Sequence, residues 1–200
     1  MSPPVLLVHG FLASRRLMWP LRRRLEASGL RVRSPRLSPL VIGDVRTLAH
    51  QLDAAVDQLL HETHIPRVDV VGASQGGILA LWWAHHIGGW SRLRRLVLLG
   101  APVQGTWAAT AGLPVLGAIS RGIWQMLPGT PLVQELSVPL PPGAEVYTLS
   151  LQGDPVSPPA RCQLPGAHNR VFSGGMGPLT HQWLMCSRPV ARELVDALKR

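Results

Sequence analysis

Short apolar runs alternate with longer segments in which apolar residues recur every three or four positions. The segment 45–62 shows this most clearly, because its apolar residues fall on one face at a period of 3.6 residues. Alternation of strand and helix predicts a parallel sheet with helices on both faces, an α/β fold. We predict strands at 5–8, 30–34, 68–71, 93–99, 146–151 and 169–173, and helices at 16–27, 45–62, 75–87 and 188–198.

Length and composition fit one compact domain. The 200 residues are of single-domain size and 46% of them are hydrophobic, enough for a large core. We therefore predict one domain over residues 1–200. No run of about 18 apolar residues is present to span a membrane. The first strand starts too early to leave room for a signal peptide, so we expect a cytoplasmic protein, the other possibility being a processed form.

The chain carries a net charge of +9, nearly all of it from arginine, with clusters at 15–16, 22–24 and 92–95. Such clusters attract nucleic acid or anionic lipid. No aromatic-interleaved basic motif or recognition helix supports nucleic acid. We expect a solvated basic surface, with peripheral contact to a lipid surface as the remaining possibility. Cys162 and Cys186 are expected to be free thiols in a reducing compartment.

The pentapeptide Gly72-Ala73-Ser74-Gln75-Gly76 stands between a predicted strand and a predicted helix. A G-x-S-x-G turn holds its serine in a strained conformation, and its glycines let the strand and the helix approach closely. The helix directs its amides and positive dipole end at the same place. The pattern arises by chance in roughly one of eight such sequences, so an ordinary glycine-rich turn is the alternative. The context favours Ser74 as a nucleophile.

A serine nucleophile at such a turn needs amide donors for the oxyanion that forms when it attacks a carbonyl. One donor is the residue after the serine, Gln75. The other comes from the loop after an earlier strand, and the strand 5–8 ends in His9-Gly10-Phe11. We predict the amides of Phe11 and Gln75 as the oxyanion hole, with His9 shaping the loop.

The acid and the base are sought between Ser74 and the C-terminus, in the order Ser, Asp/Glu, His. Glu135, Glu145 and Asp154 are the carboxylates before the last histidine. Only Asp154 follows a strand at its carboxyl end, where reactive groups gather in parallel sheets. An Asx-turn is the alternative for this aspartate.

Two histidines follow Asp154. His168 precedes the last predicted strand and His181 follows it, in the glycine-rich loop before the closing helix. Because only His181 lies at the carboxyl end of a strand, on the edge where Ser74 and Asp154 are expected, we predict His181 as the base. His168 is interpreted as a surface loop residue.

With these segments in order, the chain resembles the α/β-hydrolase superfamily, and within it the small bacterial lipases and esterases. The resemblance covers essentially the whole chain and also includes residues 98–106, which are similar to a stretch common after the sixth strand of lipases. It implies a triad of Ser74, Asp154 and His181 and no cofactor. The aspartate that some larger relatives use for calcium shortly after the histidine is missing, since Gln182-Trp183-Leu184 follow, so no metal is expected.

Residues 105–142 interrupt the alternation with an apolar segment broken by prolines. In lipases and esterases an insertion here is a lid or an acyl pocket. We predict Leu116, Ile119 and Ile123 as substrate-binding residues of a short cap over Ser74. The alternative, that these residues simply pack the edge of the sheet, stays open.

The predicted activity is hydrolysis of small-molecule acyl esters through an acyl-enzyme on Ser74. Two alternatives remain. An acyltransferase or thioesterase on the same fold would keep the triad and change only the acceptor or the ester type. A non-catalytic binding module would be expected to have lost at least one of Ser74, Asp154 and His181, and all three are present.

Overall fold

The computed structural model describes residues 3–11, 13, 16–37 and 43–200. In this part of the chain six parallel strands form one sheet in the order β2-β1-β3-β4-β5-β6. The predicted α/β architecture is confirmed. The strands are β1 (Val5–Val8), β2 (Val32–Arg33), β3 (Val68–Ala73), β4 (Leu93–Leu99), β5 (Glu145–Leu151) and β6 (His168–Phe172).

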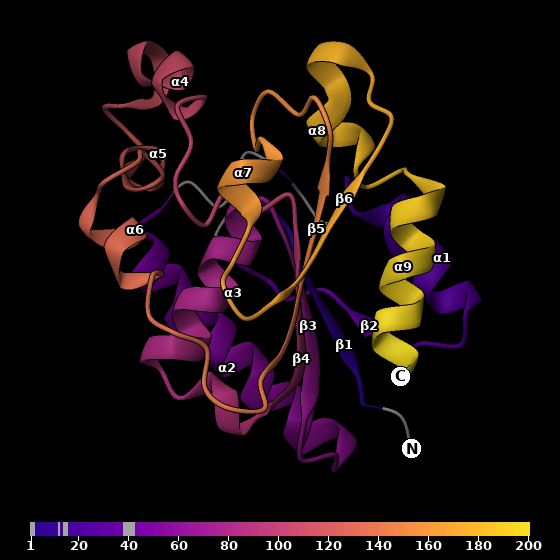
Figure 1. Cartoon of the computed structure of the whole chain (residues 1–200). Coiled ribbons are helices and arrows are strands. Elements are labelled where there is room, and N and C mark those ends of the chain that lie inside the picture. Colours follow the sequence, from indigo (N-terminus) through magenta and orange to yellow (C-terminus); the bar gives the residue numbers. More distant parts are fainter. Residues whose placement is uncertain (1–2, 12, 14–15, 38–42) are drawn as a thin grey trace.

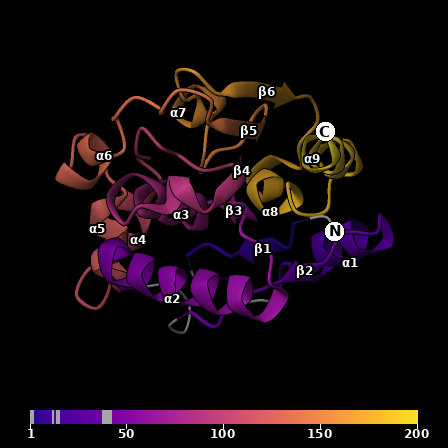
Figure 2. The same cartoon turned by 90° about the horizontal axis from the view of Figure 1, so that it is seen from below.

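Helices cover both faces of the sheet and divide the core into two layers (Figures 1 and 2). On one face α2 (Val45–Thr63) and α3 (Gln75–His86) pack against the strands. On the other face α1 (Trp19–Ala27) and α9 (Arg188–Lys199) do so. β1 and β3, in the middle of the sheet, are buried along their whole length, because each lies between neighbouring strands and under helices on both sides.

The central strand β3 carries one charged residue into the core. Asp69 is fully buried, and its carboxylate accepts hydrogen bonds from the guanidinium of Arg94 at 2.9 and 2.5 Å. Arg94 also donates to the carbonyl oxygen of Leu198 at 2.5 Å, which ties the end of α9 to the sheet. The buried charge is therefore paired rather than isolated, as burial in a core requires.

Three short helices lie between β4 and β5, in the predicted insertion: α4 (Ala109–Leu116), α5 (Arg121–Gln125) and α6 (Pro131–Glu135). Side chains fasten α5 and α6 to the rest of the domain. Gln125 accepts a hydrogen bond from the Val45 amide at the start of α2. Glu135 accepts from Arg46 and from the indole of Trp82, each at 2.6 Å. The insertion is thus attached to α2 and α3 by specific polar contacts.

The structure differs from the predicted elements mainly at their ends. α1 begins at Trp19 rather than at residue 16, because Pro20 fits only in the first turn of a helix. β2 is shorter than predicted. His181 lies in a short helix, α8 (Thr180–Trp183), where a loop was predicted, and the 3-10 turn η3 (Gly177–Leu179) precedes it. The remaining short elements are η2 (Gly89–Ser91) and α7 (Pro159–Cys162).

Two further expectations concern single features. Cys162 and Cys186 are free thiols, as predicted, the first buried and the second half-buried. Among the helices described above, none combines the length and the apolar character that crossing a membrane requires.

Candidate active site

Ser74 stands at the junction of β3 and α3 in a strained backbone conformation. Its φ is 54° and its ψ is −126°, a region that residues with a side chain rarely adopt. Gly76, two residues later, lies directly against the backbone of His9. A Cβ at this position would lie 2.6 Å from the carbonyl oxygen of His9. Only a glycine permits this approach, so the predicted strand–turn–helix geometry is present.

The loop after β1 lies directly against this turn. A Cβ on Gly10 would be 2.8 Å from the Cβ of Ser74 and 3.3 Å from the amide nitrogen of Gln75. The segment that holds Phe11 is therefore a neighbour of the first turn of α3, which contains the amide of Gln75. Two oxyanion donors must lie close to each other and to the serine, and the loop after β1 and the start of α3 meet this requirement. The role of the amides of Phe11 and Gln75 remains a prediction.

Asp154 follows β5 and is buried, with 3% of its surface exposed. One carboxylate oxygen, Oδ1, accepts hydrogen bonds from the amides of Val156 (2.8 Å) and Ser157 (2.9 Å). The other oxygen, Oδ2, lies 2.8 Å from Nδ1 of His181. The aspartate thus both forms the Asx-turn considered as its alternative and contacts the histidine.

Opposing influences act on the carboxyl group of Asp154. Burial would raise its pKa, but the hydrogen bond and charge of His181 and the amides of Ser157 and Val156 outweigh burial. The pKa of Asp154 is held below its ordinary value, and the group is ionised at neutral pH. An ionised carboxylate only accepts hydrogen bonds, so Nδ1 of His181 is the donor and Nε2 is left without a proton in the neutral ring.

The ring of His181 is also placed beside the strand that borders Ser74. Its Cε1 atom lies 3.5 Å from the position of a Cβ on Gly100. Gly100 directly follows Leu99, whose carbonyl oxygen accepts a hydrogen bond from the Ser74 amide at 2.8 Å. β3, β4 and β5 end at this same edge of the sheet, so the structure brings the turn of Ser74 and the Asp154–His181 pair to one place.

The rejected alternatives lie elsewhere. His168 begins β6 at the opposite end of that strand and stacks on Tyr147, with ring centroids 4.7 Å apart. Glu135 pairs with Arg46, and Glu145 accepts a hydrogen bond from the hydroxyl of Tyr147. None of these groups takes part in the contacts around His181 described above.

The predicted substrate-binding residues have different environments. Ile123 is buried with 2% of its surface exposed and belongs to the core formed with α2 and α3. Ile119 is 67% exposed. The side chain of Leu116 lies outside the described part of the structure. The acyl-pocket role of these residues remains a prediction.

Two residues that were not predicted lie beside the histidine. A Cβ on Gly100 would come within 2.9 Å of Leu184 Cδ2, which is too close, but would only be in ordinary contact with His181 Cε1 at 3.5 Å. Thr180 is 1% exposed, and its hydroxyl donates to the carbonyl of Gly177 and accepts from the amide of Met176, which fixes the turn before His181. The only sequence signal was the position of Thr180 next to a histidine. In the described residues no group of three His, Cys, Asp or Glu side chains is arranged to hold a metal ion.

Comparisons with known proteins agree with the fold described above. A family model described as alpha/beta hydrolase fold matches residues 3–115, more than half of the chain. The mature lipase BlEst2 of Bacillus licheniformis superposes with a TM-score of 0.72 at 16% identity, over 97% of this chain and 92% of that one. A bromoperoxidase of Bacillus anthracis superposes with a TM-score of 0.73 at 16% identity, over 100% and 93%.

A longer structure is similar over part of its length. Aspergillus fumigatus lipase B superposes with a TM-score of 0.75 at 17% identity, and the match covers 100% of this chain but 53% of the lipase. A search by sequence among curated proteins gives no match. At these identities the superpositions show the fold.

Proposed function

We propose that this chain, which belongs to the α/β-hydrolase family, hydrolyses carboxylic esters by acyl transfer to Ser74. The observation that carries the proposal is the 2.8 Å hydrogen bond between His181 Nδ1 and Asp154 Oδ2, at the edge of the sheet where Ser74 occupies its strained turn. A serine, a histidine and an oriented carboxylate at one edge are the groups that acyl transfer requires.

In the proposed mechanism His181, held in one tautomer by Asp154, takes the proton of Ser74 as the hydroxyl oxygen attacks the ester carbonyl. The amides of Phe11 and Gln75 stabilise the oxyanion, each contributing about 2.7–4 kcal/mol if they act like donors in known oxyanion holes. His181 then protonates the leaving alcohol. A water molecule activated by the same histidine releases the acid from the acyl-enzyme.

Acyl esters are the substrates that the surroundings favour. The insertion between β4 and β5 exposes apolar side chains, among them Trp107, Val115 and Ile119. Such a surface suits an acyl chain better than a charged or peptide substrate. Two of the structural neighbours named above are called lipases, which supports the same substrate class.

The test is the rate of hydrolysis of p-nitrophenyl esters by purified variants. Ser74→Ala is expected to abolish hydrolysis without loss of stability, because a small side chain at this turn contributes little packing. His181→Ala is expected to lose nearly all activity, and His168→Ala, its matched control, to change it little. Activity that survives in Ser74→Ala, or is lost in His168→Ala, would contradict the proposal. Faster transfer to an added alcohol than to water would identify an acyltransferase instead.

A further inference from the structure

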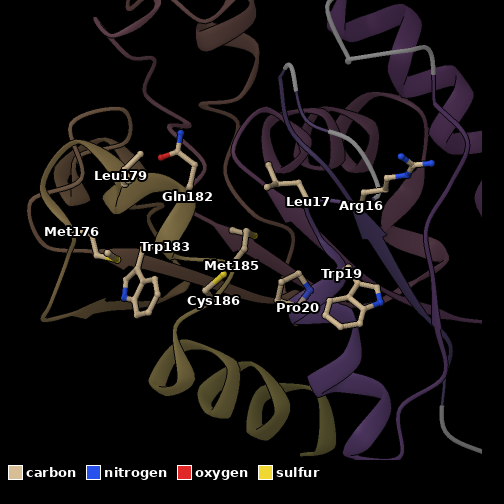
Figure 3. A pocket seen from close by; sticks show the side chains of 10 residues that line it. All are labelled: Arg16, Leu17, Trp19, Pro20, Met176, Leu179, Gln182, Trp183, Met185 and Cys186. Atoms are coloured by element: carbon tan, nitrogen blue, oxygen red, sulfur yellow. The ribbon is translucent and has the colours of Figure 1, made fainter.

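A groove of about 440 Å³ runs between the start of α1 and α8, on segments more than 150 positions apart in the sequence (Figure 3). Leu17, Trp19 and Pro20 line it on the α1 side. Met176, Leu179 and Trp183 line it on the side of η3 and α8. Met185 and Cys186 lie between the two sides in Figure 3. The lining is almost entirely apolar.

The apolar side chains of this groove are exposed far more than a core would leave them. Leu17, Trp19, Met176, Leu179 and Trp183 each expose between 41% and 59% of their surface. Single exposed apolar residues are common on proteins, but a contiguous group of large ones usually marks a binding surface. We call these five residues, together with Arg16 and Arg23, the α1–α8 face.

Arginines lie beside the same surface, on the side of α1. Residues 16–27 hold four arginines and one acidic residue, Glu26, which leaves a charge of +3 on this segment (4 − 1). Glu26 is paired with Arg22 at 2.8 Å. Arg16 lines the groove, and Arg23 lies over the ring of Trp19 at 5.5 Å from its centroid.

The positive charge continues along the molecule next to the groove. A second hollow, between α1 and α9, is lined by three arginines, Arg24, Arg188 and Arg192, and by one acidic residue, Asp196. α1 and α9 lie side by side in both overall views (Figures 1 and 2). The apolar groove is therefore bordered by a basic belt that covers two helices.

We propose that the α1–α8 face docks on an anionic lipid surface. Apolar side chains gain free energy by entering the boundary between headgroups and acyl chains, and tryptophan prefers this boundary. Arginines beside them attract anionic headgroups, and each basic residue near such a surface contributes about 1 kcal/mol. The α1–α8 face has exposed apolar side chains with arginines beside them, so it can gain free energy both from burial of apolar surface and from attraction to anionic headgroups. This charge complementarity favours an anionic lipid surface over an uncharged apolar partner.

The α1–α8 face is preformed, because core packing and a hydrogen bond hold α1 in place. Met18, which directly precedes α1, and Leu21 and Leu25 within α1 are fully or almost fully buried in the core. Arg24 donates a hydrogen bond to the carbonyl oxygen of Cys186, which joins α1 to the turn between α8 and α9. A preformed face loses little conformational entropy on binding.

The proposal does not depend on ester hydrolysis, so its test uses lipids that an esterase cannot cleave. The full-length protein is sedimented with vesicles of diether phosphatidylglycerol or diether phosphatidylcholine. It is expected to bind the anionic vesicles and to bind the zwitterionic ones at least about fivefold more weakly. Raising the salt concentration from about 0.1 to about 0.5 M should weaken binding to the anionic vesicles, because salt screens the charges.

Variants locate the contact. The double change Trp19→Ser and Leu179→Ser should weaken binding to anionic vesicles by about tenfold or more, because two exposed apolar anchors are lost. Arg23→Glu should weaken it about 30-fold, since the reversal changes the charge by two units at about 1 kcal/mol each. Trp107→Ser and Arg121→Glu are matched controls, because both residues are exposed on the insertion, on the other side of the molecule from α1. These two changes should leave binding within twofold of the unchanged protein.

Three results would overturn the proposal. The first is equal affinity for the two kinds of vesicle, or none for either. The second is a loss in the Trp107→Ser and Arg121→Glu controls as large as that in the α1–α8 variants, which would place the contact on the insertion. The third is a dimer in solution that the double change converts to a monomer while vesicle binding stays the same. That result would identify a second copy of this chain as the occupant.

Discussion

The carboxylate of Asp154 both holds an Asx-turn and orients His181. Substitution by asparagine or by alanine separates these two roles. Oδ1 accepts two backbone hydrogen bonds, from the amides of Val156 and Ser157, and Oδ2 accepts one from His181. Asparagine keeps one carbonyl oxygen, which can continue to accept from the two amides. It places an NH₂ group opposite Nδ1 of His181, and two donors cannot pair. The ring must then carry its proton on Nε2 and loses the lone pair that would take the proton of Ser74.

Asp154→Asn is therefore expected to lower kcat by about 10⁴-fold, as loss of the correct tautomer does in other triads, with little change in KM. Its free energy of unfolding should stay close to that of the unchanged protein. Asp154→Ala should lose activity as well, but it leaves two amides without an acceptor. At about 1–3 kcal/mol for each such group, this variant should be less stable by about 2–6 kcal/mol.

The assay combines kcat and KM on p-nitrophenyl butyrate with urea unfolding of the three proteins. An Asp154→Asn variant that keeps kcat within about tenfold would refute the inference that this carboxylate orients His181. Equal stability of the Ala and Asn variants would show that the Asx-turn contributes nothing, and that the buried position of Asp154 serves only the histidine.

Two further predictions concern packing. Arg94→Ala leaves the buried carboxylate of Asp69 unpaired and should lower the free energy of unfolding by about 3 kcal/mol at neutral pH. Burial already raises the pKa of Asp69, and loss of Arg94 raises it further, so the folded variant binds a proton more readily than the unfolded chain. Its deficit relative to the unchanged protein should shrink as the pH falls, and urea unfolding that gives the same deficit at about pH 7 and pH 4.5 would contradict this. Ile123→Ala should cost about 2–5 kcal/mol in thermal or urea unfolding, because the side chain is in the core, whereas Ile119→Ala should change stability by no more than about 0.5 kcal/mol. If Ile119 contacts the acyl chain, Ile119→Asp raises KM for long-chain esters and leaves acetate esters unaffected.

β1 was predictable because it is buried on both faces and all of its positions, Val5–Val8, are apolar. β4 also has the predicted bounds, Leu93–Leu99, although the half-buried Arg94 and Arg95 interrupt its apolar pattern. β2 pairs only through Val32 and Arg33, since it is at the edge of the sheet and has one neighbouring strand to hold it. Hydrophobic pattern alone does not show where such an edge strand stops.

The insertion shows where sequence reasoning lacked the necessary information. Ile119 and Ile123 are alike in type and only four positions apart, yet one is exposed and the other is in the core. Prolines divide this region into short helices, so no period of 3.6 residues extends far enough to define a buried face. Which side is buried depends on the attachment of the insertion to α2 and α3, through contacts such as that of Arg46 with Glu135, and these join distant parts of the chain.

The candidate site was predictable because several weak signals describe the same contact. Gly76 in the serine turn leaves room for the carbonyl oxygen of His9, and Gly10 in the loop after β1 leaves room for Ser74. The two glycines belong to different motifs. Each one avoids a clash between its own backbone and the segment that holds the other. A chance G-x-S-x-G sequence has no reason to be matched by a glycine at the end of the neighbouring strand β1. The prediction of Ser74 rested on this loop together with the order of Asp154 and His181 after the serine, and the two glycines reflect one close approach of two backbones.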